Sequence, residues 1–241
     1  MRNEIRYAIR GLLRDRVFAL MIVLSLAVGI GANTAIFSLV NGVLLQPPDF
    51  PHPERLVALT QWAPKLLKSY PALPVNIAIY AEWRKHTSSF ESIGIAQASV
   101  FNLTGSGQPE QVRGAIVSST IFSVLGVQPK LGRGFTDQED QSGHDQVVIL
   151  ADSLWRRRYQ ADPSIIARKI LIDGKPYEVV GVLPASFIFP REEKFGARTL
   201  GENLEIYRPV GYDSGDLKLC MGDFNFWATA RLRLGVSTAR A

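Results

Sequence analysis

Residues 17–48 contain no Asp, Glu, Lys or Arg, and this run limits what the chain can fold into more than any other feature. An α-helix needs about 20 mostly apolar residues to cross the roughly 30 Å hydrocarbon core of a membrane. The run exceeds that length, and the prolines at positions 47 and 48 would end a helix because proline lacks the backbone N–H donor. We therefore predict a transmembrane helix over residues 17–46.

The charges on the two sides of this run are unequal. Residues 1–16 hold five Arg and two acidic residues, and the first cation after the run is Arg55. Because cytoplasmic flanks of membrane helices are rich in Lys and Arg, this asymmetry predicts a cytoplasmic N-terminus and an extracytoplasmic domain over residues 50–241. Residues 1–16 also have the spacing of an amphipathic helix. The arginines that would either lie on lipid phosphates or only set the topology are Arg2, Arg6, Arg10 and Arg14.

A cleaved secretory signal is the competing interpretation of the run. Its apolar region would be only about 7–15 residues long and would end at a small-residue cleavage site. Here the run is longer, and its small residues lie inside it rather than at its end. A retained membrane helix is therefore the expectation, and the mature N-terminus would distinguish the two.

Small residues within the run lie at helical spacing. Ala27, Gly31 and Ala35 are four residues apart, so they fall on one face of a helix. Helices in lipid associate by close packing, which small side chains permit. We predict that this face packs against other transmembrane helices. The alternative is that glycine is simply commoner in transmembrane helices.

The formal charge of +5 does not indicate a nucleic-acid-binding domain. Residues 1–16 contribute +3, which leaves +2 for the remaining chain. The one basic cluster beyond the run, at residues 156–158, is interpreted as a solvated helix face. The single cysteine, Cys220, excludes an intrachain disulfide and any site that needs several cysteines.

Beyond residue 55 the pattern is one of short strands and short helices without a regular βαβ rhythm, which predicts an α+β domain. Asp173-Gly174 is a strong hairpin signal between two of the strands. Ser119 and Thr120 are predicted to cap one helix, and Asp152 another. Strands are predicted over residues 56–59, 93–103, 111–117, 147–150, 169–173, 177–182 and 226–234, and helices over residues 75–84, over residues 121–125 and after Asp152.

Motifs that carry chemistry are not found. The chain has no phosphate-binding G-x-x-x-x-G-K-[ST] sequence and no G-x-S-x-G nucleophile motif. The three His have no metal-ligand spacing, so we expect no metal, no cofactor and no catalytic residue. The acidic stretch at residues 137–140 is interpreted as a solvated turn, with a weak cation site as the less favoured alternative. Late aromatic residues are interpreted as core, or as a partner surface if exposed: Phe187, Phe189, Phe195, Phe224, Phe226 and Trp227.

Several segments of the chain together resemble one known family. At the start these are residues 29–41 (GIGANTAIFSLVN), 44–47 (LLQP) and 53–57 (PERLV). Further along they are residues 117–127 (VSSTIFSVLGV), 132–135 (GRGF), 147–155 (VVILADSLW), 162–163 (DP), 172–174 (IDG) and 179–184 (VVGVLP). Together these segments resemble the MacB-like ABC transporter permeases, and the later ones resemble the periplasmic core domain of that family. The resemblance extends along the whole chain.

This resemblance implies a bacterial inner-membrane protein that works with a partner ABC ATPase and with a second permease half. In the family, an extracytoplasmic domain is inserted between the first two of four transmembrane helices, and an FtsX-like region with the other three follows. The given sequence does not extend into such a region, and the resemblance implies that the core domain over residues 50–241 is C-terminally incomplete, lacking a last helix and strand. Ala167 stands where a Gly is common. The expectation is a truncated or split permease whose missing helices would be partners.

Two functions are the main expectations. The first is a permease component whose extracytoplasmic domain couples ATP-driven motion to export or mechanotransmission. The second is a single-pass adaptor or sensor whose helix only tethers it. An enzyme is the least expected class because no acid–base or nucleophile constellation appears.

Overall fold

The computed structural model describes residues 16–40, 50–61, 73–105, 107–190, 203–218 and 224–238. The chain forms two compact units, Met1–Pro48 and Asp49–Ala241. The predicted amphipathic helix at residues 1–16, with Arg2, Arg6, Arg10 and Arg14, lies almost wholly outside the described residues.

The first unit contains one described helix, α2 (Arg16–Val40). Its sequence accounts for the helix, because apolar residues fill almost every position and no proline interrupts it. Large apolar side chains along it are exposed, such as Val17 at 71% and Val28 at 70%. Within the described part of the chain, no helix combines the length and the hydropathy needed to cross a membrane. Residues 41–46 of the predicted helix lie outside the described residues.

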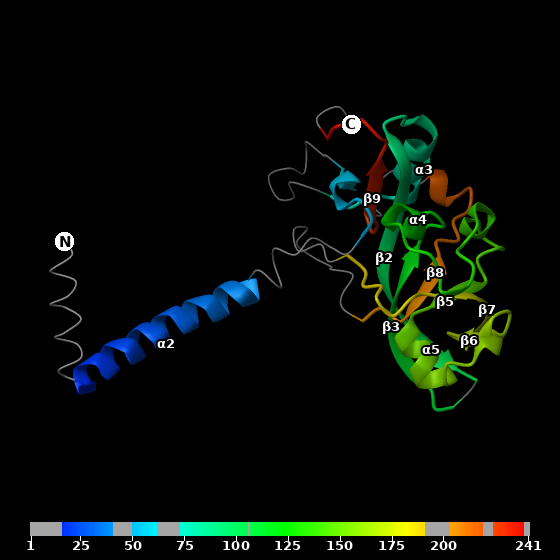
Figure 1. Ribbon diagram of the computed structural model, residues 1–241. Coiled ribbons are helices and arrows are strands. Elements are labelled where there is room, and N and C mark those ends of the chain that lie inside the picture. The colour runs from blue at the N-terminus through cyan, green and yellow to red at the C-terminus, as the bar shows by residue number, and fades with distance from the viewer. Residues whose placement is uncertain are drawn as a thin grey trace. The chain divides into compact units, whose positions relative to one another are not determined.

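The second unit is built on one mixed β-sheet (Figure 1). The strand order is β1-β9-β2-β3-β8-β5-β7-β4, and β6 pairs with both β2 and β7. β3 and β8 are parallel, as are β5 and β7, while the other pairs are antiparallel. The strands are β1 (Leu56–Leu59), β2 (Phe90–Thr104), β3 (Glu110–Val117), β4 (Leu131–Gly132), β5 (Val147–Leu150), β6 (Lys169–Ile172), β7 (Lys175–Val182), β8 (Ile206–Pro209) and β9 (Trp227–Leu232).

In the described part of the second unit, three α-helices pack on this sheet and define three apolar cores. They are α3 (Ile77–His86), α4 (Ile121–Leu125) and α5 (Asp152–Tyr159). In Figure 1, α3 and α4 lie beside β2, and α5 lies at the other end of the domain from α3. Each helix contributes buried side chains to its own cluster, which we name the α3, α4 and α5 cores. Short 3₁₀ turns connect the elements: η2 (Pro53–Arg55), η3 (Asp137–Asp140), η4 (Pro163–Ile165) and η5 (Asp216–Lys218).

The strand β5 shows why this part of the sequence is apolar without alternation. Val148 and Leu150 belong to the α5 core, whereas Ile149 between them belongs to the α4 core. Successive strand residues point to opposite faces, so a strand covered on both faces needs apolar residues at every position. The α+β class follows from this mixed, two-sided arrangement.

Most predicted elements are present. The strands β2 and β3, both predicted, pair as an antiparallel hairpin, with Phe101 opposite Val112. The turn at Asp173-Gly174 is also confirmed, with φ of 51° and 77°, as a two-residue hairpin turn requires. Gly126 ends α4 in the left-handed conformation at φ 71°.

The helix starts differ from the predictions in detail. Asn76 caps α3 by accepting a hydrogen bond from the backbone N–H of Ile79 at 2.8 Å, so that helix begins after residue 76 rather than at 75. Ala151 holds the N-cap position of α5, and Asp152 is its first helical residue. Thr120 is at the N-cap of α4 but makes no capping bond, because its hydroxyl donates to the carbonyl of Ile93 at 2.6 Å.

Candidate functional site

The predicted helix-packing residues lie on α2, which holds Ala27, Gly31 and Ala35. Apart from Gly31, its chain neighbours and the nearby backbone of α2 itself, no atom of the described residues lies within 4 Å of the position that a Cβ would take at Gly31. The side chain of Ala35 lies outside what the structure describes. That this face packs against another helix stays a prediction.

The basic cluster of α5 is paired with carboxylates. Arg156 contacts Asp152 at 2.7 Å, Arg157 contacts Glu205 at 2.9 Å, and Arg158 contacts Glu110 at 3.0 Å. Arg157 also contacts Glu110 at 2.5 Å. These arginines therefore form an ion-paired helix face, and their charge is locally balanced rather than presented as a basic patch.

The acidic stretch at residues 137–140 is not the solvated turn that its composition indicated. It forms η3, and Asp140 within it is fully buried. The backbone N–H and the hydroxyl of Ser119 each donate to Asp140 at 2.8 Å, and Arg84 lies 3.8 Å from its carboxylate. Burial raises the pKa of Asp140 to about 6, against these hydrogen bonds and the charge of Arg84. Arg84 also donates to Asp137 at 3.1 Å, so this network ties α3 to η3 and to the start of α4.

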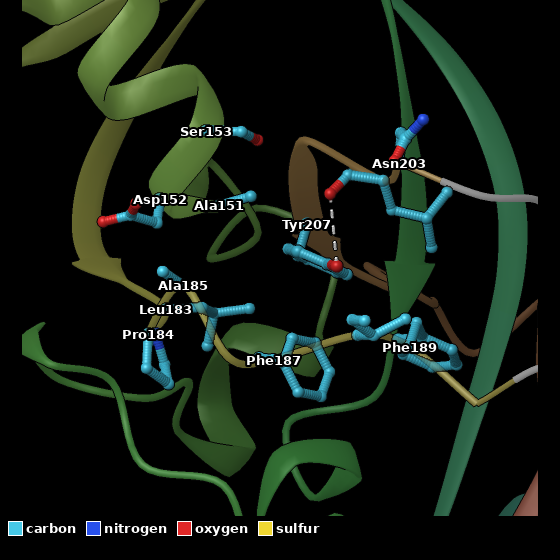
Figure 2. A pocket seen from close by; sticks show the side chains of 12 residues that line it. Ala151, Asp152, Ser153, Leu183, Pro184, Ala185, Phe187, Phe189, Asn203 and Tyr207 are labelled. Carbon is cyan, nitrogen blue, oxygen red and sulfur yellow. Dashed lines mark hydrogen bonds between the residues drawn. The ribbon is translucent and has the colours of Figure 1, made fainter. Parts of the chain in front are cut away.

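An aromatic hollow is the strongest candidate binding site in the described part of the chain (Figure 2). Its volume is about 280 Å³. Its walls include Leu183, Phe187, Phe189 and Tyr207, and polar groups at its margin come from the start of α5 and from Asn203. Pockets that bind small molecules commonly combine apolar walls with a few polar groups in this way.

Phe187 is the central ring of the walls. Its centroid lies 5.9 Å from that of Phe122, 6.0 Å from that of Phe189 and 6.1 Å from that of Tyr207. Tilted and edge-to-face pairs at such distances are favourable. The hydroxyl of Tyr207 donates to the carbonyl of Leu204 at 3.3 Å, and burial raises the pKa of Tyr207 above its ordinary value. The walls are thus held by the α4 core.

Asp152, the acidic residue at the margin of the hollow, is hydrogen-bonded to two basic side chains. Asp152 accepts hydrogen bonds from Lys130 and, at 2.7 Å, from Arg156. Burial alone would raise its pKa, but the hydrogen bonds from Lys130 and Arg156 hold the pKa of Asp152 below its ordinary value. The nitrogen of Lys130 also lies 4.1 Å from the ring centroid of Trp155. The carboxylate of Asp152 is therefore held in structural ion pairs with Lys130 and Arg156. The residues that line the hollow can bind an apolar group, and they contain no pair of groups placed to transfer a proton.

The sequence indicated only part of this hollow. Phe187 and Phe189 were among the late aromatic residues, and both line the hollow: Phe189 is a core residue, and Phe187 is half-buried and packs against the same core. Tyr207 and Asn203 were not singled out, because no local motif marks them. Phe195 and Cys220 lie outside the described residues, and among those that are described no group of three or more His, Cys, Asp or Glu could hold a metal ion.

Comparisons with known proteins agree on one family. A family model described as the MacB-like periplasmic core domain matches residues 19–240. No curated protein sequence matches the chain significantly.

Three solved structures share the fold. The periplasmic region of MacB from Actinobacillus actinomycetemcomitans has a TM-score of 0.52 at 16% identity, covering 76% of this chain and 77% of that one. The extracellular domain of the noncanonic ABC-type transporter YknZ from Gram-positive bacteria has a TM-score of 0.50 at 15% identity, covering 75% and 84%. A domain of a protein described as a permease from Porphyromonas gingivalis has a TM-score of 0.55 at 14% identity, covering 79% and 81%. At these identities the similarity is one of fold.

Proposed function

Because the chain belongs to the MacB-like periplasmic core domain family of ABC transporter permeases, we propose that it couples movement driven by a partner ATPase to export or mechanotransmission outside the membrane. The observation that carries the proposal is the family match, which extends over the folded domain and over most of the charge-free run before it. The chain has a transmitting and contacting role in this proposal, and no catalytic one.

The proposal places residues 17–46 in the inner membrane as a single span, with the N-terminus in the cytoplasm. It is supported by the absence of charge over residues 17–48 and by the excess of Arg before them. Single cysteines at position 3 and at the exposed Glu54, in a chain with Cys220 replaced by Ser, test it. We expect an impermeant thiol reagent applied to intact spheroplasts to label only position 54. Labelling of position 3, or release of the chain by carbonate washing, would contradict this topology.

Partners are tested by co-purification. We expect the chain, expressed with the ATPase and the permease segments of the same transporter, to be recovered with both from detergent. The adaptor alternative predicts recovery of the chain without the ATPase. Either outcome is read by quantitative mass spectrometry of the purified complex.

The helix face provides a matched pair of variants. Gly31→Leu should reduce crosslinking to the other permease helices several-fold, because a bulky side chain prevents close approach. Gly29→Leu is the control, since at about 3.6 residues per turn it lies on nearly the opposite side of α2. Equal crosslinking by the two variants would show that the face of Ala27, Gly31 and Ala35 is not an interface.

A further inference from the structure

Arg231, near the C-terminal end of β9, is a buried cation held by carbonyl oxygens. Only 5% of Arg231 is exposed to solvent. Its Nε donates to the carbonyl of Val124 at 2.8 Å, and its Nη1 donates to the carbonyl of Pro51 at 2.9 Å. No ion pair joins it to a carboxylate of the described residues. One guanidinium on the C-terminal part of β9 therefore bonds both the last turn of α4 and the segment that follows the N-terminal unit in the sequence.

That segment, residues 50–55, is named here the junction segment. It is also held from its own side, because Arg55 donates through Nε to the carbonyl of Leu232 at 2.8 Å and pairs with Glu91. The ring of Phe50 lies 6.4 Å from that of Phe187. The junction segment then continues directly into β1, which pairs with β9.

The contact between the junction segment and α4 depends on a glycine. Gly126, at φ +71°, ends α4, and a Cβ there would lie 3.0 Å from Cγ of Pro51. The close approach of Pro51 to the end of α4 is therefore possible with glycine, and it brings the carbonyl of Pro51 within reach of the Arg231 side chain.

Stability alone is a poor explanation for a cation in this position. Removing a guanidinium from water costs several kcal/mol, and apolar residues of similar volume often replace buried charges without loss of stability. An apolar residue in β9 cannot hydrogen-bond the end of α4 and the segment around Pro51 at the same time and in a fixed geometry. The planar fork of Arg has several donors in fixed directions, which suits it to that task.

We propose that Arg231 is a positioning residue that makes the junction segment, β9 and the end of α4 move as one body. Displacement of the chain at residue 50 is then passed to a strand inside the sheet instead of being absorbed by a loose connection. This inference rests on the proposed function, which requires motion to pass between the membrane and the domain.

Hydrogen exchange in the full chain in detergent tests the rigid connection without any transport. In Arg231→Met we expect amide exchange to rise at least about tenfold in residues 51–59 and 124–127, with the α5 core unchanged. In Arg231→Lys we expect a smaller rise, because an ammonium can serve fewer of these carbonyls. Arg233→Met is the control, since Arg233 donates to one carbonyl, that of Phe90 at 3.0 Å, from the same end of β9. Unchanged exchange in Arg231→Met, or a rise spread evenly over the domain, would overturn the proposal.

The assembled transporter tests the coupling itself. Spin labels at Glu54→Cys and Ser123→Cys, in a chain with Cys220 replaced by Ser, report the distance between the junction segment and α4. We expect one narrow distribution with and without ATP in the parent chain, and an ATP-dependent broad one in Arg231→Met. A narrow distribution in both would overturn the coupling role. If addition of ATP moves neither the domain nor the membrane helix in any variant, the proposed function is wrong. The hydrogen-exchange experiment then still shows whether Arg231 holds the three segments together.

Discussion

At the scale of the residue, Ala167 has a backbone conformation that is unfavourable for any side chain with a Cβ. Its φ is +64°, and its N–H donates to the carbonyl of Val179 at 2.8 Å, so the conformation is fixed. Glycine adopts this region without steric cost. This agrees with the resemblance noted in the sequence, which places a Gly at this position.

We predict that Ala167→Gly raises the free energy of unfolding by about 0.5–1 kcal/mol, which is the steric relief minus the added entropy of the unfolded chain. Urea denaturation measures it. Ala98→Gly in the strand β2 is the control and should lower the free energy of unfolding, because glycine weakens a strand. A loss of stability in Ala167→Gly would show that the strain is absent.

Asp140 predicts a specific dependence on pH. Its folded pKa of about 6 lies above the ordinary value of 3.8, so the folded state binds more protons than the unfolded state between those values. The contribution of Asp140 to stability is therefore complete below pH 4 and is lost as the pH rises through 6. In Asp140→Asn that loss is absent. We expect the unfolding free energy of the variant, relative to the parent chain, to increase by on the order of 2 kcal/mol from pH 4.5 to pH 7.5.

The measurement is urea denaturation at several pH values, and parallel curves for the two proteins would contradict the prediction. Asp137→Asn supplies a comparison of opposite sign. The hydrogen bond from Ser119 and the neighbouring Arg84 hold the pKa of Asp137 below its ordinary value. Its contribution is present at higher pH and is lost as the pH falls, so this variant should differ from the parent chain above pH 4 and converge with it below.

At the scale of the element, local signals account for the parts of the fold that the sequence predicted. The hairpin turn at Asp173-Gly174 and the end of α4 at Gly126 depend on backbone preferences of one or two residues, which the sequence displays. The strand β8 could not be predicted in the same way. It is short, and it is a strand because it lies between β3 and β5, far from it in the sequence.

The burial of the acidic network around Asp140 could not be predicted from the local sequence either. In the sequence its residues have the composition of a solvated loop. Asp140 can be buried because Ser119 and Arg84, which come from other parts of the chain, supply a hydrogen bond and a positive charge to its carboxylate. The hollow around Tyr207 likewise depends on how β8 is placed. The sequence therefore indicated the apolar walls through Phe187 and Phe189, but not the site.

Gly114 is the residue that permits β8 to pair with β3. A Cβ at Gly114 would collide with the carbonyl oxygen of Ile206 and lie 2.7 Å from Cε2 of Phe101. Gly114→Ala should therefore lower the free energy of unfolding by about 2 kcal/mol or more, as overpacking in a core does. It should also increase amide exchange in β8. Gly134→Ala is the control, because a Cβ at Gly134 would have no described atom within 4 Å apart from those of Gly134 and its chain neighbours. Equal stabilities for the two variants would contradict this account of the β3–β8 pair.

At the scale of the whole molecule, the second unit has apolar cores of its own among the described residues. Its three cores are built from its own residues, and the strands of the sheet come from residue 56 onward. The junction segment is held to β9 and α4 by bonds inside this unit. The domain should therefore keep its fold when the residues before it are removed.

We predict that a chain beginning at Asp49 unfolds in one cooperative transition, with a midpoint within about 3 °C of that of the full chain. For a domain of this size such a shift corresponds to about 1 kcal/mol, which is the most that loss of a separate unit should change. Calorimetry gives the midpoint, and limited proteolysis shows whether the fragment from residue 49 resists digestion. The same short chain with Arg231→Met should show the local exchange increase in residues 51–59 that is expected of the full chain. If the short chain is digested throughout, the domain depends on the N-terminal unit for folding, and the transmission proposed for Arg231 could not be separated from stability.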